Sequence, residues 1–460
     1  MTTIAKKFFG DPRVLKAKKE LLEVLKEYQS EIRSPAPAQN ELKASYAETI
    51  QDFQNIRGGN LFYPYLSSGI GNGALVELAD GSLKYDFISG IGVHHYGHSH
   101  PKLIDASLTA ALGDTVIQGN LQQNDEALLF SKTLLNAANA HGGKFAHCFV
   151  SATGVMAGEN ALKLTFQKKY PATRILAFEG CFMGRTLAFS QFTDKAAYRD
   201  GLPLNYDVDY VPFYDAKRPK ESTAEALAVL KKHLQRYPKQ HAAMCFELIL
   251  GEAGFYPAER DFHVTLMDEL RRHDIAILAD EVQSFARTTE LFAFQYFDLG
   301  DYIDAVWVGK ASQACATLFR ADFKPRAGLL SQTYTASSTA LAAGRVLIED
   351  MLSESYFGEN GKIAKFHAHC KKHLEDLAKK YPDKVAGPYG VGAMVGFTPF
   401  GGVSEKVTKF IHKLYENGVI AFTAGSNLMR ARFLLPVGAI TMDDIDAVMK
   451  IVEKTLIEVA

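Results

Sequence analysis

Short apolar runs alternate with segments of helical periodicity between about residues 145 and 332. Continuous apolar runs are typical of strands that are buried on both faces, and their alternation with helices predicts a mainly parallel sheet covered by helices. Strands are expected at 145–150, 174–178, 208–213, 243–250, 275–279, 304–308 and 327–330. Helices are expected at 156–170, 222–237, 259–273 and 336–353. The pattern therefore predicts an α/β fold with a seven-stranded sheet.

The segments on either side of this region follow other patterns. An Asp-Pro pair, which is typical of a helix start, precedes an amphipathic segment that predicts a helix over 12–32. Residues 74–78 and 83–88 flank an Asp-Gly turn and predict a hairpin. After about residue 355 the sequence predicts a separate α+β unit, which ends in a helix at 442–458.

Composition and charge argue against several classes of function. The 460 residues are 47% apolar and 22% charged, which is typical of a globular protein with a large core. Lys+Arg 51 against Asp+Glu 52 gives a net charge of −1, which argues against a nucleic-acid binder and a polybasic membrane-surface protein. No apolar run reaches the roughly 18 residues of a membrane span. Five scattered cysteines and a start without an apolar signal segment predict a soluble, cytoplasmic protein.

Two of the expected strands end in groups that can carry chemistry. The run 275–279 is followed by Asp280 and Glu281, and the run 304–308 leads to Lys310. Acids after a buried strand are costly unless they cap a helix or meet a cation, a metal or a cofactor. A lysine at such a place is either an ordinary surface residue or a desolvated amine that attacks carbonyl groups.

The spacing of Asp280 and Lys310 combines these two features into one site. They are 310 − 280 = 30 residues apart, which is one strand–helix–strand step, so they can face each other at neighbouring strand ends. A carboxylate opposite a Schiff-base lysine is what pyridoxal 5′-phosphate (PLP) requires, because the acid keeps the pyridine nitrogen protonated while the lysine holds C4′. The sequence therefore predicts a PLP site between these two residues.

Further motifs follow one another in order from about residue 65 to the end of the chain. They are Gly90–Val93 with Gly97–Pro101, Glu159–Lys163, Phe178–Thr186, Glu247 with Gly251–Gly254, and Asp280–Gln283 with Arg287-Thr288 and Leu291–Phe294. The ordered set resembles the class III (ω-) aminotransferases, a family of fold-type I PLP enzymes. The resemblance implies a large domain with a mainly parallel seven-stranded sheet and a small α+β domain.

The same resemblance implies where the domains begin and end. An N-terminal helical arm is expected at 1–60, and the N-terminal part of the small domain at 61–94. The large PLP-binding domain is expected at 95–345, and the C-terminal small domain at 346–460.

Matched residue by residue, the family motifs imply roles for four side chains. Lys310 matches the lysine that bonds the cofactor and then moves a proton between the substrate carbon and C4′. Asp280 matches the acid on the pyridine nitrogen, and Gln283 matches the residue that contacts the phenolic oxygen. Phe182 matches the aromatic residue that stacks on the ring. Lys310, Asp280 and Phe182 are therefore the expected catalytic residues.

Three further residues are expected at the cofactor phosphate. Gly154 and Val155 stand where backbone N–H groups at a helix N-terminus hold the phosphate. Thr335 resembles the threonine that reaches the phosphate of a neighbouring subunit, so the resemblance implies a homodimer with shared active sites. The sequence departs from the family at 153–156, where a hydroxyl donor is missing, and at 336–340, which replaces the usual G-G-N-P.

The substrate is expected to meet two arginines. Glu252 and Arg432 resemble the family's switching pair, whose salt bridge opens so that the arginine binds the α-carboxylate of the oxo acid. Arg430 competes for this role, but Arg432 is preferred because it directly precedes the segment 433–441. Arg185 resembles the arginine that binds the amino-acid carboxylate in lysine 6-aminotransferases, the most similar subgroup. The implied reaction is a ping-pong transfer of a terminal amino group to 2-oxoglutarate, from a donor of the lysine, ornithine, GABA or putrescine type.

Other functions share parts of this pattern. A PLP-dependent aminomutase, racemase or decarboxylase can use the same fold, and the altered phosphate loop also suits a catalytically idle homologue. A Rossmann dehydrogenase is not favoured, because the Gly-rich segment 69–74 leads into an expected strand instead of a helix. His94, His95, His98 and His100 have no standard zinc spacing, so no metal centre is predicted.

Overall fold

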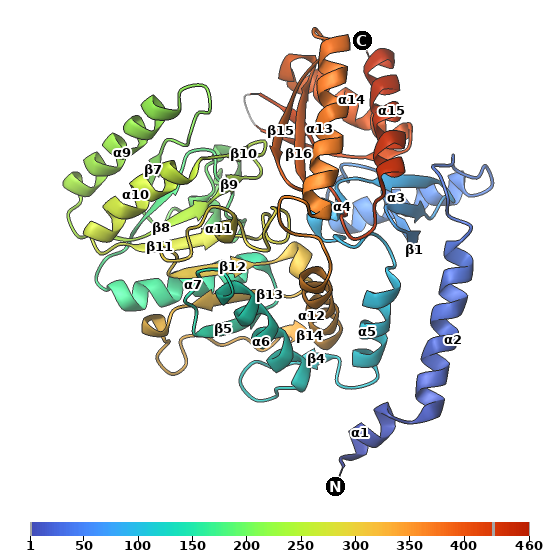
Figure 1. Ribbon diagram of the computed structural model, residues 1–460, viewed down its shortest axis with the longest axis horizontal. Helices are drawn as coiled ribbons and strands as arrows, with labels where there is room; N and C mark the ends of the chain where they lie inside the picture. Colours follow the sequence, from blue (N-terminus) through green and yellow to red (C-terminus); the bar gives the residue numbers. More distant parts are fainter. Residues whose placement is uncertain (1, 426–427, 460) are drawn as a thin grey trace.

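The computed structural model describes residues 2–425 and 428–459. Its largest sheet has seven strands in the order β5-β13-β12-β11-β8-β6-β7 (Figure 1). They are β5 (His147–Ser151), β6 (Arg174–Phe178), β7 (Val208–Val211), β8 (His241–Glu247), β11 (Ala276–Asp280), β12 (Ala305–Val308) and β13 (Cys315–Phe319). The pairings from β12 to β7 are parallel, whereas β13 runs antiparallel to β12 and β5. The expected mainly parallel seven-stranded sheet is confirmed.

Helices cover this sheet, as the alternating pattern predicts. The main ones are α5 (Pro101–Ala111), α6 (Asp125–Asn139), α7 (Gly154–Lys169), α9 (Pro219–Arg236), α10 (Arg260–Arg272) and α12 (Ser338–Ser353). Helix α7 packs across β5, β8, β11, β12 and β13, and presents small residues such as Ala157 and Ala161 to them. Every residue of β8, β11 and β12 is buried. Continuous apolar runs in the sequence thus mark the strands that are covered on both faces.

The expected strand at 327–330 is wrong, and the seventh strand is β13 instead. After β12 the chain enters a short turn in which Lys310 and Gln313 have φ angles of 53° and 62°. This turn reverses the chain, so β13 returns antiparallel between β12 and β5. Residues 327–330 form turns and bends around Gly328, whose φ is 77°. Their apolar character therefore reflects local packing and does not mark a strand.

Short elements connect the main ones at the edges of the sheet. They are α4 (Ser89–Gly92), α8 (Phe189–Phe192), α11 (Ala293–Tyr296), β4 (Val116–Ile117), β9 (Ile249–Leu250), β10 (Tyr256–Pro257) and β14 (Ala336–Ser337). Strand β10 pairs antiparallel with β9, and β14 pairs antiparallel with β4. The β9–β10 pair folds the segment 251–255 back beside the carboxyl end of β8.

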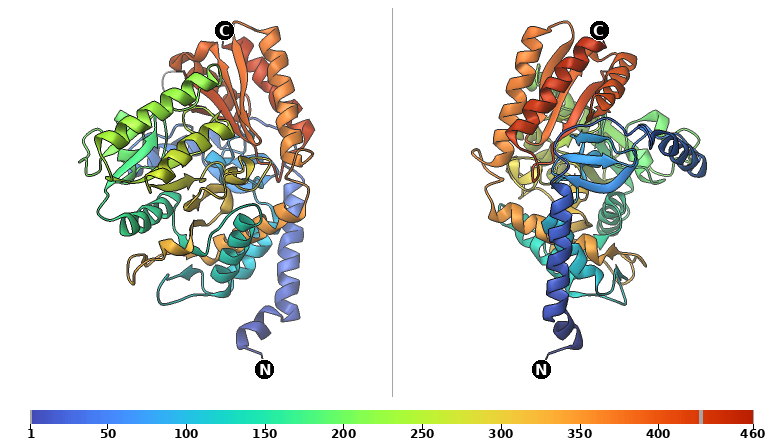
Figure 2. Two further views of the ribbon diagram at one scale, coloured as in Figure 1. Left: turned by 60° about the vertical axis from the view of Figure 1, so that its left-hand side comes forward. Right: turned by 90° about the vertical axis from the view of Figure 1, so that its right-hand side faces the viewer.

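The N-terminal region consists of α1 (Ile4–Phe9), α2 (Pro12–Gln29) and α3 (Lys43–Arg57). The Asp11 side chain accepts a hydrogen bond of 2.9 Å from Arg13 N, so it caps α2 as the Asp-Pro pair predicts. Helix α2 ends at Gln29, earlier than expected, where the side-chain amide donates to Gly71 O at 2.7 Å. Figure 2 shows α1 and the lower half of α2 extending away from the rest of the chain.

A second sheet joins the two ends of the sequence. Its order is β1 (Ser67–Asn72), β2 (Leu75–Leu78), β3 (Leu83–Asp86) and β17 (Val419–Ile420). Strands β2 and β3 form the antiparallel hairpin that the Asp-Gly turn predicts. Strand β17 lies parallel to β3, so the hairpin packs with the C-terminal part of the chain.

The C-terminal part forms an antiparallel sheet with three long helices. The sheet order is β15 (Val385–Val391), β16 (Met394–Pro399), β19 (Arg430–Leu434) and β18 (Phe422–Ala424). The helices are α13 (Lys362–Lys380), α14 (Ser404–Glu416) and α15 (Met442–Glu458), and they lie together in both views of Figure 2. Thr441 and Asp444 form a capping box at the start of α15. None of the helices in the described ranges is both long and apolar enough for a membrane span.

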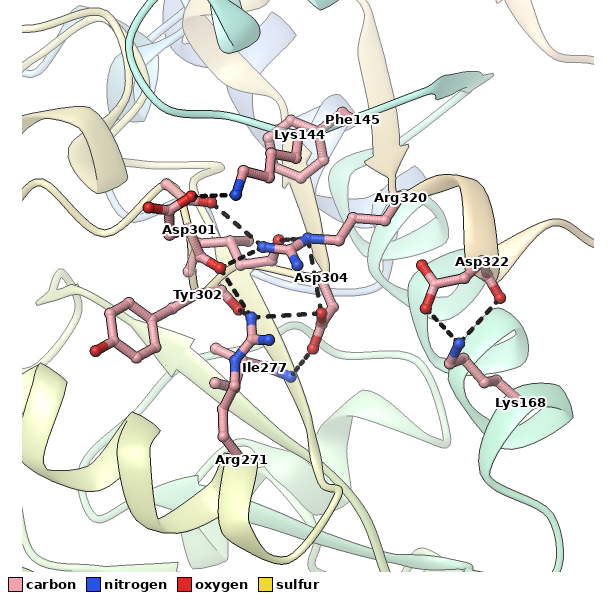
Figure 3. A network of polar contacts seen from close by, with 12 residues as sticks. Lys144, Phe145, Lys168, Arg271, Ile277, Asp301, Tyr302, Asp304, Arg320 and Asp322 are labelled. Atoms are coloured by element: carbon pink, nitrogen blue, oxygen red, sulfur yellow. Dashed lines mark hydrogen bonds and ion pairs between the residues drawn. The ribbon is translucent and has the colours of Figure 1, made fainter.

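A polar network holds the amino ends of β11 and β12 (Figure 3). Asp304, which precedes β12, accepts a hydrogen bond of 2.9 Å from Ile277 N. Its other carboxylate oxygen lies 3.8 Å from Arg271 Nη2 and 3.7 Å from Arg320 Nε. Both guanidinium groups also donate to the carbonyl of Asp301. This end of the sheet is thus closed by charges that the protein itself balances.

Candidate active site

A cavity of about 260 Å³ lies at the carboxyl ends of β8, β11 and β12. The expected residues that line it are Gly154, Val155, Phe182, Glu252, Asp280, Gln283 and Lys310. Parallel sheets present the carboxyl ends of their strands at one edge, which is why residues from distant parts of the sequence meet here. The acid and the lysine that the spacing argument paired therefore line the same cavity.

Asp280 is the last residue of β11 and is buried. Its Oδ1 accepts a hydrogen bond of 2.9 Å from Val282 N, which fixes the carboxyl group. Burial raises the pKa of Asp280 to about 7, although that hydrogen bond and the charge of Lys310 act in the opposite direction. Among the described residues Asp280 has no ion-pair partner. A buried carboxylate in this position suits a cationic group such as a protonated pyridine nitrogen.

Lys310 stands at the start of the turn that follows β12. Its φ of 53° lies in the left-handed region, which side chains other than glycine and asparagine rarely adopt. Burial lowers the pKa of its amine to about 8, Arg432 and Arg287 lower it as well, and Glu252 and Asp280 oppose the shift. A larger fraction of the amine is therefore neutral near physiological pH than for an ordinary lysine. Such an amine can attack a carbonyl carbon.

Gln283, Glu252 and Arg432 form one hydrogen-bonded group beside Lys310. Arg432 Nη2 lies 2.8 Å from the Glu252 carboxylate, and Nη1 donates to Gln283 Oε1 at 3.3 Å. Gln283 Nε2 donates to Glu252 Oε1 at 3.2 Å. Burial alone would raise the pKa of Glu252, but the charges of Arg432 and Lys310 outweigh it and hold that pKa below its ordinary value. The guanidinium of Arg432 is fully buried, so Glu252 neutralises a cation inside the protein.

The N-terminus of α7 forms another part of the cavity wall. Thr153 caps this helix by accepting a hydrogen bond of 3.2 Å from Met156 N. A Cβ atom at Gly154 would lie 2.9 Å from a methyl carbon of Val282, so the tight approach of helix and strand end requires glycine. The first N–H groups of a helix have no partner within it, and they favour a phosphate. The residues at this end of the cavity therefore fit the phosphate of PLP.

Two positions expected for the ring and the substrate lie near one another. Phe182 is half-buried in the cavity wall, and its ring meets Tyr198 edge-on at 6.2 Å. Arg185 is exposed, and its guanidinium lies 3.8 Å from the centre of the Tyr198 ring. Phe182, Tyr198, Glu252 and Phe422 line a neighbouring pocket of about 440 Å³. Arg185 lines neither this pocket nor the Lys310 cavity.

Thr335 lies apart from the other expected residues. Its backbone N–H donates to Ile117 O at 3.0 Å, and its hydroxyl donates to Gln332 O at 3.3 Å. It lines a different cavity, of about 530 Å³, that contains Gly119 and Asn124. Within one chain the structure therefore does not bring Thr335 to Lys310.

Glu247 also lines the cavity, although the sequence motifs imply no role for it. Glu247 ends β8 and accepts hydrogen bonds from Phe182 N at 2.7 Å and Gly251 N at 3.1 Å. Burial and the neighbouring charge of Asp280 raise its pKa to about 8. The carboxyl group thus ties the Phe182 segment to the 251–255 segment. The available signal was that Glu247 is the single acid inside the expected apolar run 243–250.

Arg287 is a second buried residue that the motifs left without a role. Its Nη1 donates to Gln283 O at 2.9 Å, and its Nη2 donates to Gly92 O. Burial lowers the pKa of this guanidinium to about 9. Arg287 therefore joins α4 to the backbone of Gln283 and places a positive charge near Lys310.

Comparison with known proteins gives a consistent result. The family model for class-III aminotransferases matches residues 64–456. Acetylornithine aminotransferase from Methanocaldococcus jannaschii is 28% identical over 411 residues, which cover 85% of this chain and 93% of that protein. The solved lysine aminotransferase from M. tuberculosis superposes with a TM-score of 0.79 at 22% identity, over 89% of this chain and all of that one. Ornithine aminotransferase from Toxoplasma gondii gives a TM-score of 0.76 at 20% identity, over 92% and 99%.

The match to the family model covers most of the chain and includes every residue of the Lys310 cavity. The two solved structures share the fold of 89% and 92% of this chain. An aminotransferase of this family depends on PLP, which agrees with the buried acid, the amine and the helix N-terminus that the cavity combines. The chain belongs to the class III aminotransferases and is a PLP-dependent enzyme of fold type I.

Proposed function

We propose that this aminotransferase takes a terminal amino group from an amino acid or a diamine and delivers it to 2-oxoglutarate. The observation that carries the proposal is the Glu252–Arg432 pair in the same wall as Lys310, at 2.8 Å. A buried arginine whose charge is neutralised by a movable acid can accept substrates with and without an α-carboxylate. The named relatives act on acetylornithine, lysine and ornithine, and each of these donors carries a terminal amine.

Lys310, Asp280 and Gln283 would act on the cofactor and on the proton that moves during transfer. Bound PLP supplies a carbonyl group that takes up the amine and a ring that accepts electrons when the substrate C–H bond breaks. Lys310 Nζ would take the proton from the substrate carbon and return it to the cofactor carbon. Asp280 would hold a proton at the ring nitrogen, and the Gln283 amide would donate to the phenolic oxygen.

Glu252 and Arg432 would select between the two substrates of the reaction. With the donor bound through its terminal amine, Glu252 stays on Arg432 and cancels its charge. With 2-oxoglutarate bound, Glu252 swings away and the guanidinium holds the α-carboxylate through two parallel hydrogen bonds. The pair therefore costs little to bury in either state, because the arginine always faces a carboxylate.

Arg185 and Phe182 are proposed to define the donor side of the site. The Arg185 guanidinium stacks on Tyr198, which lines the pocket next to the Lys310 cavity. If Arg185 binds the donor carboxylate, its distance from Lys310 would set the length of the donor that places its terminal amine at the cofactor. Phe182 would cover one face of the cofactor ring, with its backbone fixed by Glu247. A lysine-type donor is the first candidate, since it has both a terminal amine and a distal carboxylate.

We further propose a cytoplasmic homodimer without a nucleic-acid or membrane partner. The place of Thr335 supports the dimer, because the cavity that it lines lies apart from Lys310 in one chain and a second subunit would have to bring the two together. The near-neutral net charge of −1 and five free cysteines support the absence of a nucleic-acid partner and a reducing location.

A panel of amine donors tests the proposed reaction. Purified protein with PLP is incubated with 2-oxoglutarate and, separately, lysine, ornithine, GABA, putrescine or β-alanine, and glutamate is quantified. At least one donor with a terminal amine is expected to give one glutamate per donor consumed. Loss of donor without glutamate would instead indicate an aminomutase, racemase or decarboxylase. No turnover together with weak PLP binding would favour a catalytically idle protein.

A further inference from the structure

Two histidines and an aspartate meet on the surface of the C-terminal part, and none of them lines the Lys310 cavity. His369 and His373 are one turn apart on α13, and Asp446 belongs to α15. His369 Nε2 lies 2.6 Å from Asp446 Oδ1, and His373 Nε2 lies 2.7 Å from the same oxygen. The three side chains are between 29% and 40% exposed, so the cluster is open to solvent.

The geometry of the two imidazoles is that of a pair of metal ligands. Both Nε2 atoms point to one place, because they contact the same carboxylate oxygen, and the ring centres are 4.8 Å apart with planes inclined by 84°. The three ligand atoms lie within 4.8 Å of one another. Zinc with bonds of about 2.1 Å needs its ligand atoms roughly 3.4 Å apart, so the Asp446 oxygen would have to move away from the two Nε2 atoms, which it contacts at 2.6 and 2.7 Å.

The charge of the surroundings allows a cation at this place. In the part of the chain that the structure describes, the only ion-pair partners of Asp446 are these two histidines. Two lysines of α13 face other acids: Lys371 lies 3.9 Å from Glu375, and Lys380 lies 2.6 Å from Glu453.

We propose that His369, His373 and Asp446 form a binding site for a divalent transition-metal ion, with Zn²⁺ as the best fit. Two imidazole nitrogens and one carboxylate oxygen leave a fourth position for water, a set that suits zinc and excludes Mg²⁺, which prefers oxygen ligands. Two histidines one turn apart on a helix are a recurrent zinc-binding arrangement.

The ion would join α13 to α15, whose ligands are 73 and 77 residues apart in sequence. Because only the folded chain brings the three groups together, binding would stabilise the C-terminal part in proportion to the zinc concentration. This role is structural and does not depend on the proposed amine transfer, so the two proposals are tested separately.

The test uses the PLP-loaded full-length enzyme without a histidine tag, freed of metals by chelation and dialysis. ZnCl₂ or MgCl₂ is titrated by calorimetry, and thermal unfolding is recorded with and without Zn²⁺. The variants are His369→Gln, His373→Gln and Asp446→Asn. His273→Gln is the matched control, because His273 is an exposed helix-end histidine that faces a single acid, Glu269, at 3.4 Å.

We expect one Zn²⁺ per chain in the wild type and in His273→Gln, with a rise in the unfolding temperature, and no response to Mg²⁺. Either single histidine variant should weaken binding at least about tenfold and abolish the thermal shift, whereas its metal-free unfolding temperature stays close to that of the wild type. The proposal is overturned if the wild type binds no Zn²⁺, or if both histidine variants keep the same stoichiometry and affinity.

Discussion

Asp280 and Asp304 lie at opposite ends of neighbouring strands in the same sheet, and their partners differ. Asp304 faces two guanidinium groups and a backbone N–H at the amino end of β12 (Figure 3). Asp280 has a backbone N–H and, at longer range, the amine of Lys310, whose own charge is disfavoured by burial. Both acids follow the same local pattern of an acid beside a buried strand, yet one end is balanced and the other is open to a ligand.

The comparison shows how one sheet serves two purposes. Charges with fixed protein partners stabilise the loops at the amino ends of the strands. Charges without such partners at the carboxyl end are held in place by the surrounding fold, and under the proposed function they would gain their counter-charge from the cofactor and the substrate. Buried charged groups without a fixed protein partner therefore mark the carboxyl end as the candidate functional edge, and four variants can break or sharpen this contrast.

Removal of the cavity amine should have the largest effect. Lys310→Ala is expected to abolish the visible absorbance band of bound PLP and to lower kcat by at least about 10³-fold, because it deletes both the covalent anchor and the base. Lys144→Ala is the matched control at the other end of the sheet, where Lys144 forms an exposed ion pair with Asp301 at 2.6 Å. An active Lys310 variant with an unchanged spectrum would contradict the proposed role.

Neutralising each acid should separate function from stability. Asp280→Asn is expected to lower kcat/KM by about 10²–10³-fold while the protein stays folded, because the ring nitrogen loses its proton partner. Asp304→Asn is expected to keep kcat/KM within about twofold and to lower the free energy of unfolding by about 1–2 kcal/mol, because two guanidinium groups lose their anionic partner at 3.7 and 3.8 Å. Steady-state kinetics measure kcat/KM and urea unfolding measures the free energy of unfolding. The contrast is refuted if the two variants change both quantities to the same extent.

The raised pKa of Asp280 predicts how the stability of the cofactor-free protein depends on pH. Between the ordinary pKa of 3.8 and the folded pKa of about 7, the folded chain keeps a proton that the unfolded chain loses. The free energy of unfolding should therefore fall as pH rises through this window, by up to about 4 kcal/mol for this group. Asp280→Asn removes this contribution, so its stability relative to the wild type should grow from pH 4 to pH 7. The prediction is contradicted if urea unfolding gives the same difference in unfolding free energy between Asp280→Asn and the wild type at pH 4 and at pH 7.

The smallest effect is expected at the Glu252–Arg432 pair. Glu252→Gln leaves Arg432 without its anionic partner, so the KM for 2-oxoglutarate should fall about three- to tenfold, whereas the KM for a terminal-amine donor without an α-carboxylate should rise. Separate measurement of the two half-reactions tests this. A uniform loss in both half-reactions would mean that Glu252 maintains the structure of the wall and does not select substrates.

Local sequence patterns were enough to predict much of the fold and the centre of the site. The apolar runs identify β5, β6, β7, β8, β11 and β12, and of these β8, β11 and β12 are buried along their whole length. Asp280 and Lys310 could be paired because each directly follows such a run. The strand β13 was missed because a turn with two left-handed residues, and not its composition, decides that the chain reverses there.

Other parts of the site depend on contacts that no local pattern contains. Glu247 and Arg287 act through hydrogen bonds to backbone groups 4 to 195 residues away, and such bonds leave no mark in the sequence. The place of Arg185 depends on the ring of Tyr198, thirteen positions on. Thr335 lines a cavity apart from Lys310, and its role would involve a second subunit.

The left-handed backbone of Lys310 also determines how replacements at this position should be interpreted. Glycine and asparagine can adopt a φ of 53° with little cost, whereas valine, isoleucine and threonine cannot. A branched residue there would distort the hairpin between β12 and β13 and, with it, the middle of the sheet. Inactivity of Lys310→Val would thus report a misfolded scaffold, and Lys310→Asn is the variant that isolates the chemistry of the missing amine.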